Sequence, residues 1–305
     1  ALDEDCFHLF FANITEEGPK YYKWLEQPAM DKYALLLTAE THTKPEDVRR
    51  SQRRHNVLGW AGEISPAVQY TDRQGEHHWA AGTVAMARHH IARNRNYSSQ
   101  NPHSPIVVKG DFFVFISVRF KGVNIAFGAI YLECGIGPLG PNLVRLHQLA
   151  EVLRNLNQPW LIIGDWNFPP EDLKGIGYPN TVGGEIICPA GIEATCTSGD
   201  PKMLDYGMAS KDLFPAVELY PVWEAPFKPH LGIGAEIKAC PRALMKRAPI
   251  IPKSLPKLGD QAPPTADLER LRSRAQEWAT AAYQPTVGNT RWPRETTAED
   301  RATIY

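Results

Sequence analysis

Short apolar runs separated by polar loops recur through the first 240 positions of the chain. Runs of this length, bounded by turn-forming residues, predict buried strands. We interpret as strands Cys6–Ile14, Tyr33–Thr41, Gly82–Arg88 and the segments "PWLIIGDW", "MLDYGMAS" and "LGIGAEI". A longer run, Asp111–Leu132, is interrupted at "KGVN" and predicts two strands joined as a hairpin.

Two segments have the spacing of helices. One is Gly18–Met30, between the first two predicted strands. The other is Leu143–Leu156, whose apolar stripe consists of Leu143, Leu146, Leu149, Ala150 and Leu153. Because strands alternate with helices and a hairpin is also present, the pattern predicts an α/β chain with mixed sheets flanked by helices.

The pattern changes after Cys240. Residues 241–264 are rich in proline and predict an extended linker. Thr265–Tyr283 predicts one helix, and the remaining residues to 305 are polar and predict irregular structure. The expected organisation is a domain over 1–240, a linker over 241–264 and a C-terminal helix and tail over 265–305. Such an extension is suited to contacting a protein partner.

Composition narrows the class of protein. The chain has 305 residues, is 43% hydrophobic and 22% charged, and carries a formal net charge of −1, typical of a globular protein without an overall basic character. No run of eighteen apolar residues predicts a membrane span, and the acidic start is unlike a secretory signal. The five cysteines are odd in number and widely spaced, which favours an intracellular reducing compartment such as the nucleus, the cytoplasm or an organelle.

Basic residues are concentrated in Arg49–His55 and Arg88–Arg95. As functional groups they would contact phosphate, and Arg88 and Arg93 are the candidates for substrate binding. The commoner use of any one such cluster is a solvated helix face.

Aromatic and histidine side chains allow two interpretations. Trp60 and Trp79 are of a type that stacks on bases, although packing in the core or in loops is the commoner use. The histidines other than His230 lack metal-ligand spacing and are expected to be solvated.

Polar side chains stand at the carboxyl ends of several predicted strands, where open α/β sheets bind ligands. In chain order these residues are Asn13, Glu40, Tyr131, Asp165 and Asn167. Two further polar residues follow, Asp205 within "MLDY" and His230 just before a predicted strand. Each alone is explained by the start of a loop. Together they supply oxygen ligands for a hard cation, a phenol and an acid–histidine pair. That set suits metal-assisted attack on a phosphate ester.

These motifs resemble, in matched order, those of the endonuclease/exonuclease/phosphatase superfamily. The corresponding segments are "FANI", "LLLTAETH", "AAGTVAMAR", "GAIYLECG", "LIIGDWN", "MLDYGMAS" and "KPHLGIGAEI". The resemblance covers Cys6 to Ile237, and the proline-rich extension makes retrotransposon-type endonuclease domains the nearest in style. It implies a DNase I-like, four-layer α+β sandwich in which two packed mixed β-sheets are flanked by helices.

The resemblance also implies roles for the residues. Glu40 would hold Mg²⁺ or Mn²⁺, and Asn13 would position the metal ligands. Asp165 would orient or activate the attacking water, or assist the leaving group. Asn167 would hydrogen-bond the phosphate, and Tyr131 would donate to the phosphate or the leaving oxygen. Asp205 would orient His230, whose imidazole would stabilise the developing charge.

The chain departs from the family pattern at two acidic positions. Pro229 stands immediately before His230, where the family has Asp, and Thr15 stands where an acid often follows the first Asn. Removing a positioned acid or base commonly lowers the rate by about 10²–10⁴. Glu224 or Glu236 could replace the missing carboxylate from a nearby segment.

Three hypotheses about function stay open. The first is a metal-dependent nuclease acting on DNA or RNA, favoured by the basic clusters. The second is a phosphatase or diesterase for a small phosphorylated molecule, favoured by the near-zero net charge. The third is a catalytically inactive member kept as a binding or assembly module, favoured by Pro229, Thr15 and the C-terminal extension.

Overall fold

A computed structural model describes residues 6–71, 75–91, 109–120 and 122–238, together with residues 269 and 273. Residues 6–238 lie in one compact unit, which spans 1–246. The predicted linker and C-terminal helix lie outside the described residues, apart from residues 269 and 273, and stay predictions. None of the described helices combines the length and the apolar character needed to cross a bilayer.

The first sheet has six strands in the order β13-β14-β1-β2-β6-β3. Their bounds are β1 Cys6–Asn13, β2 Leu35–Ala39, β3 Trp60–Ser65, β6 Thr83–Arg88, β13 Val217–Val222 and β14 Gly232–Lys238. β1 and β2 are parallel, and the other neighbours in this sheet are antiparallel.

The second sheet also has six strands, in the order β11-β12-β10-β9-β8-β7. Their bounds are β7 Lys109–Gly110, β8 Phe113–Phe120, β9 Val123–Tyr131, β10 Trp160–Asp165, β11 Gly184–Ile187 and β12 Asp205–Ser210. β9 and β10 are parallel, and β8 pairs antiparallel with β9. This pairing confirms the predicted hairpin.

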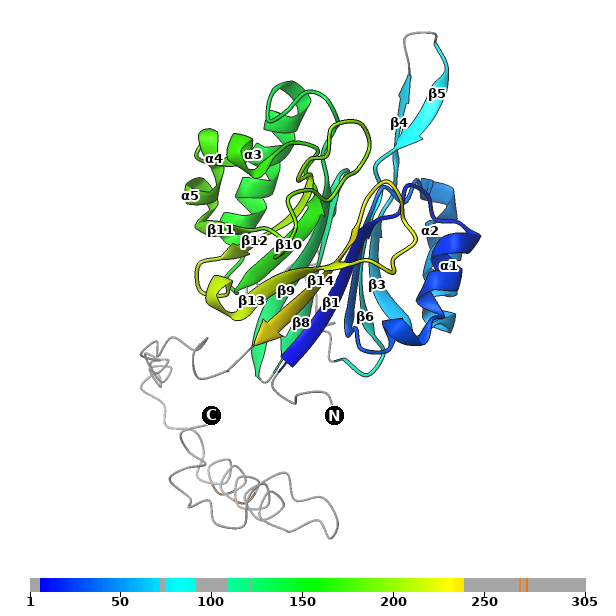
Figure 1. Cartoon of the computed structure of the whole chain (residues 1–305). Helices are drawn as coiled ribbons and strands as arrows, with labels where there is room; N and C mark the ends of the chain where they lie inside the picture. The colour runs from blue at the N-terminus through cyan, green and yellow to red at the C-terminus, as the bar shows by residue number, and fades with distance from the viewer. Residues whose placement is uncertain are drawn as a thin grey trace. The chain divides into compact units, whose positions relative to one another are not determined.

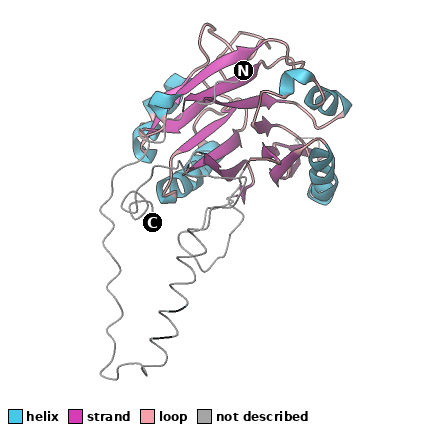
Figure 2. Ribbon diagram, turned by 90° about the horizontal axis from the view of Figure 1, so that it is seen from below, coloured by secondary structure: helices cyan, strands magenta, loops and turns pink. Residues whose placement is uncertain are grey.

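Helices cover the outer faces of both sheets, so that the molecule has four layers (Figures 1 and 2). α1 (Pro19–Leu25) and α2 (Val48–Val57) lie beside the first sheet, and α3 (Gly140–Asn155), α4 (Pro170–Gly175) and α5 (Tyr178–Val182) lie beside the second. Short 3-10 turns occur at Pro28–Met30, Pro45–Asp47 and Phe214–Ala216. The predicted sandwich of two mixed sheets flanked by helices is confirmed.

Burial on both faces explains why the strands read as continuous apolar runs. In β10, Leu161 and Ile163 face the other sheet and join the core between the sheets. Trp160 and Ile162 face the opposite way and pack in the core beneath α3. A third core lies between the first sheet and the helices α1 and α2.

Several local predictions need correction. The predicted helix Gly18–Met30 ends at Leu25, and a separate 3-10 turn begins at Pro28, because proline lacks the N–H that would continue the helix. In α3 the predicted stripe is buried except for Leu143, which is 36% exposed in the first turn of the helix.

Helix α2 was not predicted, because it buries Ser51 and His55 instead of an apolar stripe. His55 is fully buried, so the expectation of a solvated side chain is wrong for this residue. Its ring nitrogens lie 2.8 Å from the Tyr21 hydroxyl and 2.9 Å from the Ser51 carbonyl oxygen. Burial lowers its pKa to about 4, so the imidazole is neutral and serves as a hydrogen-bonding core residue. Trp60 is likewise a fully buried core residue.

A close approach between β9 and β10 requires the glycine of "GDWN". A Cβ at position 164 would lie 2.2 Å from both the carbonyl oxygen and a side-chain methyl of Ile130. Backbone cannot yield as a flexible side chain can. Gly164 therefore sets the spacing of the two strands immediately before Asp165.

We expect Gly164→Ala to lower the free energy of unfolding by about 1–3 kcal/mol through this overpacking. Urea denaturation followed by circular dichroism measures the change. Gly175→Ala in α4 is the matched control, because a Cβ there meets nothing within 4 Å. If Gly164→Ala were as stable as Gly175→Ala, the claim that a Cβ at position 164 overpacks against Ile130 would be wrong.

Candidate active site

The carboxyl ends of the two parallel strand pairs meet at one edge of the sandwich. Asn13 ends β1 and is in register with Ala39, the residue before Glu40. Tyr131 ends β9 and is in register with Asp165, which ends β10. Because both pairs are parallel, each sheet brings two of the predicted site residues to its edge.

Two side-chain hydrogen bonds join the sheets at this edge. Asn13 Nδ2 donates to Asp165 Oδ2 at 2.8 Å, and Tyr131 Oη donates to Glu40 Oε1 at 3.1 Å. Burial, followed by the charge of Glu40, raises the pKa of Tyr131 well above its usual range. The phenol therefore stays protonated and remains a hydrogen-bond donor.

An acid–histidine pair completes the cluster. Asp205 begins β12 in register with Asp165, and its Oδ2 lies 2.8 Å from His230 Nδ1. Ligand atoms of Asp165, Asp205 and His230 all lie within 4.8 Å of one another. The three side chains are buried, with Asp205 fully so.

The two acids and the histidine shift one another's protonation. Burial acts to lower the pKa of His230, but the charge and hydrogen bond of Asp205 outweigh it and raise the pKa to about 10. Burial and the charge of Asp205 raise the pKa of Asp165, although His230 and Asn13 oppose this. An imidazolium between two buried carboxylates thus balances part of their charge.

Trp166 and Asn167 support the cluster. Trp166 is buried, stacks on Tyr206 with a centroid distance of 5.3 Å, and donates to the Tyr206 carbonyl oxygen, so it packs beside the site as a structural residue. The backbone N–H of Asn167 donates to Asp165 Oδ1 at 3.0 Å. Asn167 Nδ2 donates to the carbonyl oxygen of Leu132 at 2.7 Å and joins the exits of β9 and β10.

The donor set fits a hard divalent cation. Carboxylate oxygens are the ligands that Mg²⁺ and Mn²⁺ prefer. Asp205 Oδ1 is buried without a hydrogen-bond partner among the described residues, which leaves an oxygen lone pair free for a cation. Glu40 is half-buried, and its charge acts on Asp165.

Backbone strain is concentrated at the same edge. The non-glycine residues with positive φ among those described are Thr15, Glu40, His42, Ala81 and Asn167. Four of them lie in the loops that directly follow β1, β2 and β10. The fifth, Ala81, accepts a backbone hydrogen bond from His42 in the loop after β2. Each such conformation costs on the order of 1–3 kcal/mol and persists only where the surroundings enforce it. Strain of this kind is characteristic of functional sites.

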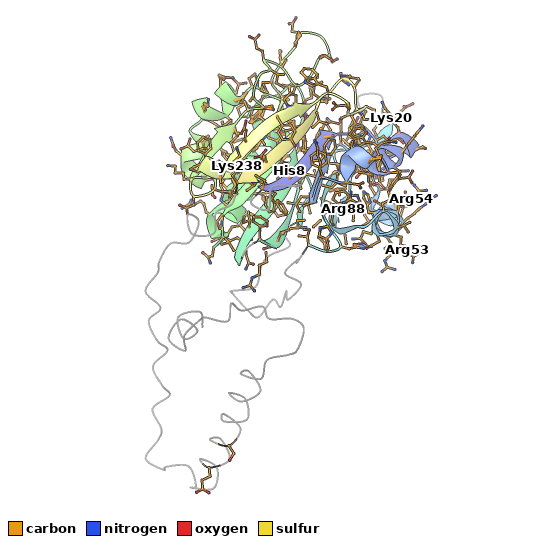
Figure 3. The ribbon with its side chains drawn as sticks, turned by 60° about the horizontal axis from the view of Figure 1, so that its bottom comes forward. His8, Lys20, Arg53, Arg54, Arg88 and Lys238 are labelled. Atoms are coloured by element: carbon orange, nitrogen blue, oxygen red, sulfur yellow. The ribbon has the colours of Figure 1, made fainter. Side chains whose placement is uncertain are left out.

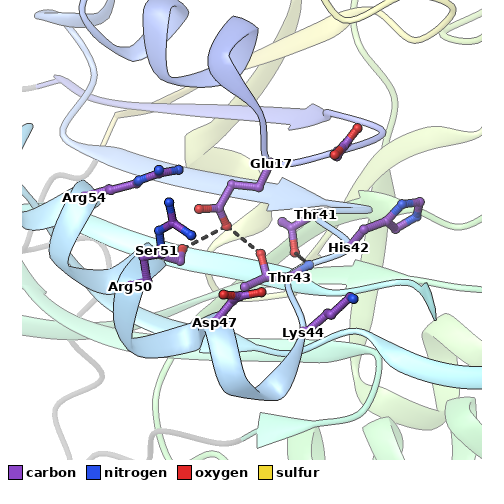
Figure 4. Close-up of a pocket in the computed structure, with 10 residues that line it drawn as sticks. Glu17, Thr41, His42, Thr43, Lys44, Asp47, Arg50, Ser51 and Arg54 are labelled. Atoms are coloured by element: carbon purple, nitrogen blue, oxygen red, sulfur yellow. Dashed lines mark hydrogen bonds between the residues drawn. The ribbon is translucent and has the colours of Figure 1, made fainter.

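Glu17 holds the exits of β1 and β2 together (Figure 4). Its N–H donates to the carbonyl oxygen of Thr41 at 2.9 Å. Its carboxylate accepts hydrogen bonds from Thr43 Oγ1 at 2.5 Å, from Ser51 Oγ at 2.8 Å and from the hydroxyl of Tyr22. Burial raises its pKa, an effect that the hydroxyl donors partly oppose. Glu17 thereby links α1, α2 and the loop that follows Glu40, and it lines a pocket of about 260 Å³.

Arg88 is not brought to this edge. It ends β6, which runs antiparallel to β2, so it lies at the opposite end from Thr83 by about 17 Å, five residues at roughly 3.4 Å each. Figure 3 shows Arg88 at that end together with His8 and Lys238. Its guanidinium stacks 3.9 Å from the centroid of Trp60 and donates to the Met30 carbonyl oxygen. Arg88 therefore lies away from the candidate active site and packs in the fold, and Arg93 lies outside the described residues.

Among the described residues, neither of the two acids proposed to stand in for a carboxylate before His230 belongs to the Asp165–Asp205–His230 cluster. Glu236 pairs in register with His8, at the end of β14 remote from His230. Glu224 is exposed in the loop after β13, outside the Asp165–Asp205–His230 cluster. The carbonyl oxygen of Pro229 accepts hydrogen bonds from the N–H and the hydroxyl of Thr197.

Two supporting residues escaped sequence reasoning. The hydroxyl of buried Thr195 accepts from the N–H groups of Leu204 and Asp205, at 3.0 and 2.8 Å, and so fixes the start of β12. Glu17 acts through partners 26 and 34 residues away. Neither lies in an apolar period or at a strand end, so only the fold identifies them.

Comparison with solved structures identifies the class of fold. The endonuclease domain of TRAS1, a telomere-specific non-LTR retrotransposon, is 15% identical, with 76% of this chain and 98% of that one covered and a TM-score of 0.51. The AP endonuclease LMAP from Leishmania major is 11% identical, with 77% and 88% covered and a TM-score of 0.53. The 3′ phosphatase NExo from Neisseria, bound to a product DNA hairpin, is 12% identical, with 76% and 99% covered and a TM-score of 0.50.

The chain therefore has the fold of these two endonucleases and this phosphatase, which confirms the DNase I-like sandwich that the sequence motifs predicted. At these identities the likeness concerns the fold. No protein-family model matches the sequence, and no curated protein matches it either.

The Asp205–His230 pair makes stability depend on pH. Because the folded-state pKa of His230 lies above its ordinary 6.5, this pair stabilises fully below about pH 6.5 and loses its contribution as the pH rises through about 10. We expect Asp205→Asn to move the NMR titration of His230 down from about 10, because the substitution removes the charge that does most to oppose burial and leaves mainly the smaller effect of Asp165 against it. A His230 titration unmoved by the substitution would contradict the pairing.

Glu17 yields a separate prediction for the exit loops. Glu17→Ala leaves three hydroxyl donors without their acceptor, and we expect unfolding to be easier by about 1–3 kcal/mol. Hydrogen exchange at the amides of Thr41 and His42 should accelerate. Glu26→Ala, at the exposed residue directly after α1, is the control and should change stability by less than about 0.5 kcal/mol.

Proposed function

We propose that this protein is a phosphodiester hydrolase that depends on Mg²⁺ or Mn²⁺ and acts on nucleic acid. The observation that carries the proposal is the convergence of two buried aspartates, a histidine, a glutamate and a tyrosine from two sheets at one edge. The neighbours in fold support nucleic acid as the substrate, since they include two endonucleases and a phosphatase bound to DNA.

A bound cation would polarise a phosphoryl oxygen and stabilise the charge of the transition state. Glu40, Asp165 and Asp205 offer the hard oxygen ligands for it. Asn13 holds the Asp165 carboxylate in place through its amide. In this proposal Asp165 orients the attacking water and accepts its proton, which the raised pKa favours.

Hydrogen-bond donors would stabilise the phosphate. With its pKa near 10, His230 is an imidazolium at neutral pH and can stabilise the negative charge that develops on the phosphoryl oxygens. Tyr131 remains a donor and can contact the phosphate or the leaving oxygen. Asn167 has one amide hydrogen engaged by Leu132 and a second available for substrate.

Pro229 supports a reduced rate, because this position provides no carboxylate beside His230. The expected reduction is about 10²–10⁴ relative to an enzyme with the acid in place. The same observation favours a second function, a binding module that keeps the phosphate-contacting edge without turnover. A small phosphorylated substrate remains a further alternative for the same residues.

Cleavage of supercoiled plasmid and of an abasic duplex tests the proposal. We expect nicking that requires Mg²⁺ or Mn²⁺, that chelation abolishes, and that falls at least 100-fold in Asp165→Ala and Glu40→Ala. Glu26→Ala is the matched loss of an acid away from the site and should cleave normally.

Nicking that persists in both site variants would come from a contaminant and would overturn the proposal. Metal-dependent phosphate release from small substrates without nicking would favour the small-molecule alternative. Nucleic-acid binding without any turnover would favour the binding module.

A further inference from the structure

Exposed aromatic side chains stand at both outer ends of the edge that carries the candidate active site. In the first sheet this edge runs from the end of β13 to the end of β3, and between them lie the start of β14, the ends of β1 and β2, and the start of β6. Five strand spacings of about 4.8 Å make it roughly 24 Å wide. Trp223 follows β13 at one end, and a β-hairpin connects β3 to β6 at the other.

The hairpin consists of β4 (Val68–Thr71) and β5 (His77–Ala80). Figure 1 shows it projecting beyond the ends of both sheets. Backbone hydrogen bonds attach both ends of the hairpin to the loop after Glu40. The His42 N–H donates to the Ala81 carbonyl oxygen at 3.1 Å, and the Ala67 N–H donates to the Thr43 carbonyl oxygen at 2.8 Å. The hairpin is therefore held next to the candidate metal ligand.

Aromatic side chains lie on both faces of the hairpin. Tyr70 is 49% exposed, and its ring lies 5.5 Å from that of its register partner His78. Trp79 points to the other face, since neighbouring residues of a strand alternate in direction. Lys44 from the loop after Glu40 lies 5.8 Å from the centroid of Trp79. The hairpin thus places a cation beside an aromatic ring.

At the far end of the edge, Trp223 is 61% exposed, more than any other aromatic residue among the large exposed apolar side chains of the described segments. It directly follows buried Val222, which is in register with Gly232 near the start of β14. His230 lies two residues before Gly232. Trp223 and the hairpin therefore flank the catalytic residues from opposite sides.

We propose that Tyr70, Trp79 and Trp223 stack on the bases of a single-stranded stretch of nucleic acid on either side of the scissile phosphate. This inference rests on the proposed function, whose substrate class it specifies. Aromatic platforms beside cations bind single strands without regard to sequence, in grooves that take up roughly 4–16 nucleotides. Continuity of the edge from Trp223 through the carboxylates to the hairpin is what selects a polynucleotide as occupant.

Binding without turnover tests the proposal directly. The full chain is titrated, in the presence of chelator, into a fluorescein-labelled twelve-nucleotide oligothymidylate, and anisotropy reports the Kd. We expect Tyr70→Ala/Trp79→Ala and Trp223→Ala each to weaken binding by about five- to fiftyfold. Trp223→Phe keeps a ring and should retain most of the affinity.

Phe214→Ala is the matched control, because Phe214 is an aromatic residue that is 38% exposed and lies away from the site. It stands in a 3-10 turn after β12, and β12 begins at the site with Asp205 and runs away from it. It should bind within twofold of the wild type. Wild-type affinity in both the hairpin variant and the Trp223 variant would overturn the proposal. An equal loss in Phe214→Ala would do the same.

Hydrolysis of bis(p-nitrophenyl) phosphate, a diester without bases, separates this inference from the proposed function. The aromatic variants should hydrolyse it like the wild type while their KM for oligonucleotide rises. If the wild type hydrolyses neither substrate but the aromatic variants still lose oligonucleotide binding, the proposed function fails and the aromatic binding surface stands. If the wild type hydrolyses the diester but the aromatic variants bind the oligonucleotide as tightly as the wild type, the proposed function stands and the aromatic binding surface fails.

Discussion

The buried carboxylate of Asp165 is the constraint around which the site is organised. It ends a strand whose residues are buried on both faces, and it is 1% exposed itself. Removing a charged group from water is costly unless partners compensate. The compensation comes from both sheets, through Asn13 from β1, the Asn167 backbone, and the imidazolium of His230 near Asp205. The arrangement of the two sheets and the chemistry of the edge are therefore linked.

The same edge concentrates backbone conformations that are unfavourable in isolation. Glu40 and His42 both have positive φ, at 57° and 52°. The backbone bonds to Gly82 and Ala81 and the network around Glu17 hold the loop in this form. A carboxylate held by its surroundings loses little further freedom when it binds a ligand, which is the advantage of preorganisation.

Pro229 is the departure that bears most on the proposed chemistry. The fold and most of the polar set agree with the proposed phosphodiester hydrolysis, whereas position 229 has no ionisable group. Asp165, Asp205 and His230 are all buried, and their candidate ligand atoms lie within 4.8 Å of one another, so the cluster holds charged groups that are costly to remove from water. Stability alone does not require such a cluster, since apolar replacements of similar volume for a buried ion pair are often neutral or stabilising.

Local sequence determined β1, β2, β6, β10, β12 and β14, the hairpin β8–β9, helix α3 and the polar residues beside these strands, whereas β3, β4, β5, β7, β11 and β13 were not predicted. The features that were predicted depend on the period of apolar residues and on turn chemistry, which act over a few positions. Helix α2 and the burial of His55 could not be predicted, because Tyr21 and Ser51 satisfy a polar face that reads as solvated. The role of Glu17 could not be predicted either, because its partners are distant in the chain.

The direction in which each strand runs within its sheet was decided only by the tertiary structure. Arg88 and Glu236 have the charges that a phosphate site could use, but the antiparallel course of β6 and β14 puts them at the opposite end from Glu40 and His230. Asn13 and Asp165, 152 residues apart, meet because both end strands that are parallel to a neighbour at the shared edge. The sequence alone determined which residues could do chemistry. Strand direction and sheet packing determined which of them come together, because those depend on contacts that no local pattern contains.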